Sequence, residues 1–122
     1  MPLRPAVTSA MVDIILECKP DTKALEEIGA QSLQWTRSLE RLLYAMNGTG
    51  FVAAFDWQSA YKDTLGKTVS LRHINNASLS EVRRLLIYHV RLDRFCTGHL
   101  ESIALSGVLD GLLDRLAKLK PA

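Results

Sequence analysis

Apolar runs of membrane-spanning length are absent from the sequence, and so is a recognisable targeting segment. The apolar residues near the N-terminus are interrupted by Asp13, and no small-residue cleavage site follows them. A transmembrane helix needs about 20 consecutive apolar residues. We therefore expect neither a membrane-spanning helix nor a signal peptide.

Cysteine is also scarce, because the chain contains only Cys18 and Cys96. Each lies on the apolar side of an expected helix. Two such thiols suit a reducing compartment better than a disulfide scaffold. We expect both thiols to be buried and reduced, and the protein to be cytoplasmic.

Neither charge sign is in marked excess. The formal net charge is +2, which is too small by itself to indicate a nucleic-acid partner. The chain is 48% hydrophobic and 23% charged, as soluble globular proteins are, and it has no internal repeat. A chain of 122 residues can bury roughly two-thirds of its unfolded surface. We expect one domain over residues 1–122.

The common catalytic motifs are missing as well. There is no G-x-S-x-G elbow, P-loop, H-E-x-x-H or G-x-G-x-x-G. His99-x-Glu101 resembles the start of a zinc-deaminase motif, but the downstream Pro-Cys-x-x-Cys is lacking. We expect no cofactor and favour a protein without catalytic activity.

Amphipathic helix patterns dominate what is present and predict an all-α fold, a compact single-domain bundle of five or six helices. The clearest pattern covers residues 78–98, where Ser78 and Glu81 form a capping box and Gly98 can end the helix. One side of this helix carries Val82, Leu85, Leu86, Val90, Leu92 and Cys96, and the other carries Arg83, Arg84, Arg91 and Arg94. The rest of the chain is expected to pack around it.

Two helices are expected before this one. The first is capped by Thr8 or Ser9, and the second runs from Asp21 to Met46 with Asn47-Gly48 as its stop. Their apolar stripes are Met11, Ile14, Ile15 and Cys18 in the first, and Leu25, Ile28, Ser32, Trp35, Leu39, Leu42 and Met46 in the second. We expect the second stripe to lie along the 78–98 helix.

The remaining elements are shorter. Asp56 is expected to cap a helix that ends at Gly66, and residues 67–77 to form a loop with at most a short ordered piece. A break at Ser106-Gly107 separates the last two helices. The final helix carries the leucine stripe Leu105, Leu109, Leu112, Leu116 and Leu119. This stripe is expected to be core, with a homodimer seam as the alternative.

Polar residues on the apolar side of the 78–98 helix form the first candidate site. His89 and Asp93 are spaced i,i+4 and can satisfy each other or reach Arg94. With Cys96 and His99 they include metal-ligand types, but a single cysteine does not match structural zinc patterns, and we expect no metal. Cys96 at a helix C-terminus is also poorly placed for a thiolate nucleophile.

A row on the same helix forms the second candidate site. Arg84, Tyr88, Arg91 and Phe95 are spaced four, three and four residues apart, which aligns two guanidinium groups with two aromatic rings. Such a row suits phosphate contacts with base stacking, and equally a protein-binding hot spot. The plain alternative is a solvated face with Phe95 under the next helix. No lysine-rich tail supports nucleic acid, so a protein partner is favoured.

Three segments, GFVAAFDW (50–57), LDRFCTG (92–98) and ALSGVLDGLLDRL (104–116), resemble a small prokaryotic family of unknown function. In that family a Gly-Phe-Val and Phe-Asp-Trp stretch precedes a helix ending in Arg-Phe-Cys-x-Gly, followed by Ser-Gly and a closing helix. Residues 1–47 carry none of the resemblance, and it implies no activity. It implies one neighbourhood containing Asp56, Trp57, Arg94, Phe95, Cys96, Gly98, Ser106 and Gly107, with Asp56 or Asp93 pairing with Arg94.

Three functions therefore stay open. The favoured one is a non-catalytic protein-binding module that uses the row Arg84, Tyr88, Arg91 and Phe95, or its own dimer seam, to bind an unidentified partner. The second is a nucleic-acid binder that uses Arg83, Arg84, Arg91 and Arg94. The third is a small enzyme or ligand site around the polar cluster Asp56, Trp57, His89, Asp93, Arg94 and His99.

Overall fold

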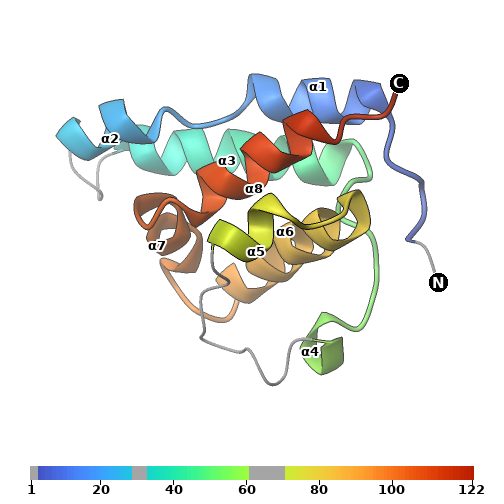
Figure 1. Ribbon diagram of the computed structural model, residues 1–122. Coiled ribbons are helices and arrows are strands. Elements are labelled where there is room, and N and C mark those ends of the chain that lie inside the picture. Colours follow the sequence, from blue (N-terminus) through green and yellow to red (C-terminus); the bar gives the residue numbers. More distant parts are fainter. Residues whose placement is uncertain (1–2, 29–32, 61–70) are drawn as a thin grey trace.

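The computed structural model describes residues 3–28, 33–60 and 71–122, and these residues form an all-α domain (Figure 1). The fold class predicted from the sequence is confirmed. The helices are α1 (Ser9–Glu17), α2 (Thr22–Ile28), α3 (Leu33–Gly48), α4 (Trp57–Ala60), α5 (Leu71–Asn75), α6 (Leu79–Asp93), α7 (His99–Leu105) and α8 (Val108–Lys118). The described part has more helices than the five or six predicted, because the expected second helix is described as α2 and α3, and α5 is a short helix in the expected loop. No helix within the described ranges is long and apolar enough to cross a membrane.

Helix α8 packs against α1, α5, α6 and α7 and carries the centre of the core (Figure 1). Leu109, Leu112 and Leu116 are fully buried, so the leucine stripe is core as expected. Leu105 at its start is exposed. Gly107 makes the predicted break, with φ at +87°. Because the middle of the stripe is buried within the chain, it is not available as a homodimer seam.

Helix α6 begins where the sequence predicts but ends one turn early. The Ser78 hydroxyl accepts from the N–H of Glu81 at 3.2 Å, which confirms the cap. The helix ends at Asp93, and the next residues form turns that reach Gly98. Gly98 has φ at +82° and precedes α7 instead of closing α6. Cys96, in these turns, is exposed, so its predicted burial is wrong.

The expected long second helix is described as two helices, α2 and α3. Residues 29–32 and the side chains of Leu25 and Ile28 lie outside the described part. In α3 the predicted stripe is confirmed: Trp35, Leu39, Leu42 and Met46 are buried. Helix α3 packs chiefly against α1 and α7, however, and not along α6 as expected. Helix α6 instead makes its main helix contacts with α8, α7 and α4.

Local hydrogen bonds and backbone conformations set the boundaries of the remaining helices. The Thr8 hydroxyl accepts from the N–H of Met11 and caps α1. Helix α3 ends at Gly48, as predicted, and Gly50 then adopts φ at +82°. Asp56 accepts from the N–H of Ser59 at 3.2 Å and begins α4, while the predicted end of this helix lies outside the described residues. Within the expected loop at 67–77, α5 is the short ordered piece.

Candidate functional site

Tyr88, from the predicted surface row, is buried. Its side chain is 2% exposed. Its ring contacts Trp57 of α4, at 5.9 Å between centroids, and the ring of His89, at 5.0 Å. Helix α4 packs on this part of α6. Helical spacing put Tyr88 on one line with Arg84, Arg91 and Phe95, but it did not reveal that α4 covers the line.

The other members of the row differ in exposure and contacts. The Arg84 guanidinium lies 5.8 Å from the centre of the Phe55 ring and donates to the Ser80 hydroxyl. Arg91 is half-buried. Phe95 is 71% exposed and not tucked under the next helix, with its ring 6.0 Å from that of Trp57. The row therefore does not form one continuous binding surface.

Arg83 was expected on the solvent side of α6 but is only 3% exposed. Its guanidinium donates to three backbone carbonyls, those of Phe51 at 2.9 Å, Gly50 at 3.1 Å and Leu3 at 3.4 Å. Burial, and then the neighbouring charge of Arg84, lower the pKa of Arg83. Arg83 thus fastens the start of the chain and the segment after α3 to α6. Its donors are engaged within the fold and do not face a nucleic acid.

His89 and His99 form a pair where α6 meets α7. Nδ1 of His89 lies 2.9 Å from Nε2 of His99, and the rings stack at 5.1 Å with an interplanar angle of 22°. Burial, and secondarily the charge of His99, lower the pKa of His89 to about 4. Burial also lowers the pKa of His99, while Asp93 opposes that shift. Both rings are therefore neutral at pH 7, and one donates to the other.

The carboxylates of the predicted polar cluster cap helices. Asp93 accepts from the N–H of Leu100 in the first turn of α7, at 2.8 Å. Hydrogen bonds from Ser59 lower the pKa of Asp56. Arg94 is exposed, and within the described residues it forms no ion pair with Asp56 or Asp93. The ion pair that the resemblance implied, between Arg94 and Asp56 or Asp93, is therefore wrong.

Part of the implied neighbourhood does exist, because Trp57 at the start of α4 contacts Phe95 just after α6. Among the residues described, no three histidine, cysteine, aspartate or glutamate side chains converge as a metal site requires. The predicted polar cluster therefore divides: His89 pairs with His99, Asp93 caps α7, Asp56 caps α4, Trp57 packs on Tyr88 and Phe95, and Arg94 is exposed. The pairing, capping and packing residues each have a structural task.

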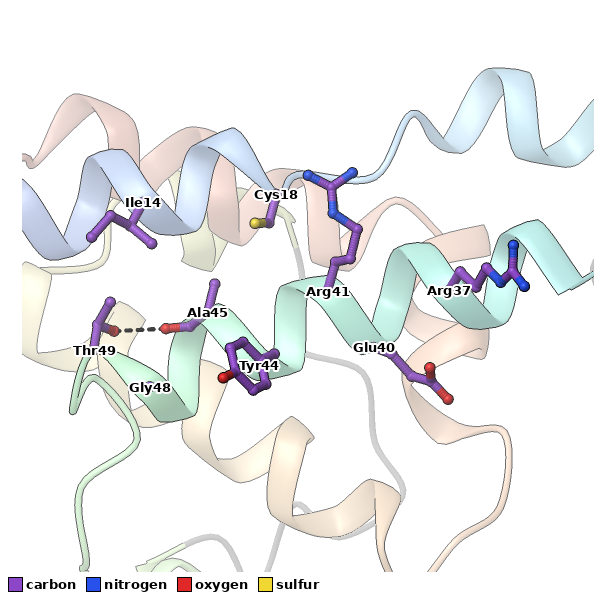
Figure 2. A pocket seen from close by; sticks show the side chains of 9 residues that line it. All are labelled: Ile14, Cys18, Arg37, Glu40, Arg41, Tyr44, Ala45, Gly48 and Thr49. Atoms are coloured by element: carbon purple, nitrogen blue, oxygen red, sulfur yellow. Dashed lines mark hydrogen bonds between the residues drawn. The ribbon is translucent and has the colours of Figure 1, made fainter.

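A groove between α1 and α3, which the sequence analysis did not identify, has a volume of about 750 Å³ (Figure 2). It is open to solvent. One end is apolar, formed by Ile14 of α1 and by Tyr44, Ala45 and Gly48 of α3, with Thr49 beside them. Ile14 is 45% exposed and Tyr44 83%. Large apolar groups left open in a concave surface are typical of binding sites.

The other end of the groove is basic. Arg37 and Arg41 extend from α3, with Glu40 between them in sequence, and the Cys18 thiol lies on the α1 side (Figure 2). Neither arginine forms an ion pair within the described ranges. The groove is therefore polarised along α3, from an apolar end to a cationic end.

Sequence reasoning missed this groove for a definite reason. The apolar spacing of the first helix places Ile14 in the core stripe, although Val12 and Ile15 are the residues of α1 that are fully buried. A signal was present on α3, where Arg37, Glu40, Arg41 and Tyr44 follow helical spacing and place an aromatic ring on a polar face. The groove itself requires α1 beside α3, which local patterns do not specify.

Comparison with known proteins places the chain in a family. The model of a family of unknown function, DUF6508, matches residues 12–122. The chain belongs to the DUF6508 family. No curated protein and no solved structure matches it.

Membership in DUF6508 agrees with the family of unknown function inferred by resemblance, but the match reaches further. The resemblance began at residue 50, whereas the family match begins at Val12. It therefore includes most of α1 and all of α3, which form both walls of the groove.

Proposed function

We propose that this DUF6508 protein is a non-catalytic protein-binding module whose partner docks in the α1–α3 groove. One observation carries the proposal: the groove leaves Ile14 and Tyr44 open to solvent beside Arg37 and Arg41. Tyrosine and arginine are enriched among the residues that dominate protein–protein binding energy. Covering the apolar end with a partner would remove this exposed area from water.

The contacts of the polar residues argue against the catalytic alternative. His89 contacts His99 within the fold, and Asp93 and Asp56 accept backbone N–H groups of α7 and α4. Asp93 lines a cavity of about 420 Å³ beside α3 and α7, but Asp56, His89 and His99 are not among the described residues that line it. These residues therefore fit roles in folding better than a shared site.

The nucleic-acid alternative also loses support. Of its four arginines, Arg83 is buried and Arg84 contacts Phe55 and Ser80. Arg91 and Arg94 alone would give a small phosphate-binding surface, and DNA-binding proteins commonly use many more cationic contacts. We further propose a cytoplasmic location, which the two free thiols support.

A groove-filling variant, Gly48→Trp, tests the proposal. Gly48 lies in the groove, an added Cβ there meets no described residue within 4 Å beyond its own helix backbone, and its φ is not positive. The indole would occupy the groove without straining the backbone. In affinity purification from the native host, we expect partners recovered with the wild type to be lost with Gly48→Trp.

Two control variants make the result specific. Gly48→Ala changes the same backbone position without filling the groove, and Arg91→Glu/Arg94→Glu reverses charge on the α6 side. Both should recover the same partners as the wild type. The proposal fails if Gly48→Trp retains the partners, or if only the α6 variant loses them.

A further inference from the structure

We infer that the occupant of the α1–α3 groove is an amphipathic helix that carries acidic residues toward one end of its apolar face. This inference rests on the proposed function and adds the chemistry of the partner and the spacing of its acidic and apolar residues. It follows from the polarity of the groove, its shape and the charges that line it.

The described lining of the groove has a net positive charge, which lies at one end. Arg37 and Arg41 contribute two positive charges, and Glu40 is the only carboxylate among the described residues that line the groove. Neither arginine forms an ion pair within the described ranges. A carboxylate on the partner would face cations that are not already paired, which favours an acidic segment over a basic one.

The apolar end sets the second requirement. Ile14, Ala45 and Gly48 offer a surface without charged groups, and Tyr44 stands beside it. Leucine-sized side chains at helical spacing would fill this end in the manner of other helix-in-groove complexes. A nucleic acid would satisfy the arginines but would leave the apolar end uncovered, so a protein segment is favoured.

The distance between the two ends fixes the spacing in the partner. Arg41 and Gly48 are seven positions apart on one helix, and Arg37 and Gly48 eleven. At the α-helical rise these separations are about 10 and 16 Å. A docked helix that runs along α3 should therefore place its acidic residues about two to three turns from its apolar anchors.

Fluorescence anisotropy with two labelled helical peptides tests this inference. Each peptide has about five turns, with leucines in the first two turns; one carries two glutamates about two turns further along, and the other carries two lysines there. The wild type should bind the glutamate peptide more tightly, and Gly48→Trp should abolish binding. Arg37→Glu/Arg41→Glu should lower the affinity for the glutamate peptide about fivefold to tenfold at low salt. The same variant should bind the lysine peptide more tightly than the glutamate peptide.

Three results would overturn the inference. The first is equal binding of the two peptides, and the second is binding unaffected by Gly48→Trp. The third is a homodimer in sedimentation that Gly48→Trp dissociates, because a second copy would then be the occupant. If Gly48→Trp still abolishes partner capture in any of these cases, the proposed function stands and the acidic helix does not.

Discussion

His89 illustrates how packing decides the role of a single polar residue. It lies on the apolar side of α6, where the sequence allowed a ligand site or a self-satisfied pair. The structure pairs its Nδ1 with His99 at 2.9 Å. Its Nε2 is buried and has no hydrogen-bond partner in the described part of the chain. The ring is therefore tolerated as a neutral group, since a buried charge would cost far more.

This environment predicts acid sensitivity. The pKa of His89 falls from 6.5 in the unfolded chain to about 4 in the fold. Between these values the unfolded state binds more protons, so the stabilising contribution is complete above pH 6.5 and is lost as the pH falls toward 4. His99, whose pKa is also lowered, adds in the same direction, and Asp93 opposes it. The loss from His89 is at most about 3 kcal/mol.

Urea unfolding at about pH 7 and pH 4.5 measures this effect, with His89→Gln as the matched variant. Other groups titrate in this range in both proteins, so the comparison isolates His89. The free energy of unfolding of the wild type should fall by at least about 1 kcal/mol more than that of His89→Gln. Parallel losses in the two proteins would show that His89 is not buried in its neutral form.

Arg83 is a polar residue whose position in the sequence predicted exposure, but which is buried in the structure. Its position among four arginines suggested a solvated face, yet its guanidinium is enclosed by the carbonyls of Gly50, Phe51 and Leu3. A long side chain can turn from the polar side of a helix toward neighbouring backbone. The spacing of residues along α6 does not show that the segments containing Leu3 and Gly50 pack against it. This contact could therefore not be predicted from the sequence.

At the scale of elements, helix starts were predictable because their caps are local. Thr8 and Ser78 each accept an N–H three residues ahead, as their sequence context indicates. The buried faces of α3 and α8 could also be predicted, because apolar periodicity is likewise a local pattern in the sequence. The end of α6 could not be predicted, because Asp93 there caps α7 through the N–H of Leu100. That contact depends on how two helices meet.

Two glycines at element boundaries provide a direct test of the backbone. Gly107 separates α7 from α8 with φ at +87°, a conformation that disfavours any side chain. Gly48 is helical, and a Cβ there meets open space. We expect Gly107→Ala to lower the free energy of unfolding by about 1 kcal/mol. Gly48→Ala should leave it unchanged or raise it by up to about 1 kcal/mol.

Equilibrium unfolding in guanidinium chloride compares the two alanine variants under the same conditions. Apart from the local backbone, neither glycine has an atom of the described residues within 4 Å of the added Cβ, so steric crowding does not separate them and φ does. Equal destabilisation by both substitutions would contradict the assigned conformations. A neutral Gly48→Ala would also qualify this variant as the control for the groove experiments.

At the scale of the whole molecule, the proposed binding groove lies apart from the helix faces that form most of the contacts around α8. Helix α8 and the facing sides of α6 and α7 are used for the core. The α1–α3 side instead keeps apolar and cationic groups open in the groove. This division could not be predicted from the sequence, because the groove joins Ile14 and Cys18 to residues 37–49. Only the packing of α1 on α3 brings these segments together.

Two exposed aromatic residues allow the central claim to be tested directly. Tyr44 lies in the groove and is 83% exposed, while Phe95 follows α6 and is 71% exposed. Each can be replaced separately by photoreactive p-benzoylphenylalanine, and the two variants irradiated in cells of the native host. The two probes differ in position but little in accessibility, so each serves as the control for the other.

The groove account predicts a discrete protein adduct from the variant substituted at Tyr44. This adduct should disappear when Gly48→Trp is added, and the variant substituted at Phe95 should give no adduct. An adduct from the Phe95 position alone would instead favour the α6 row that the sequence suggested. That result, or a Tyr44 adduct undiminished by Gly48→Trp, would contradict docking in the α1–α3 groove.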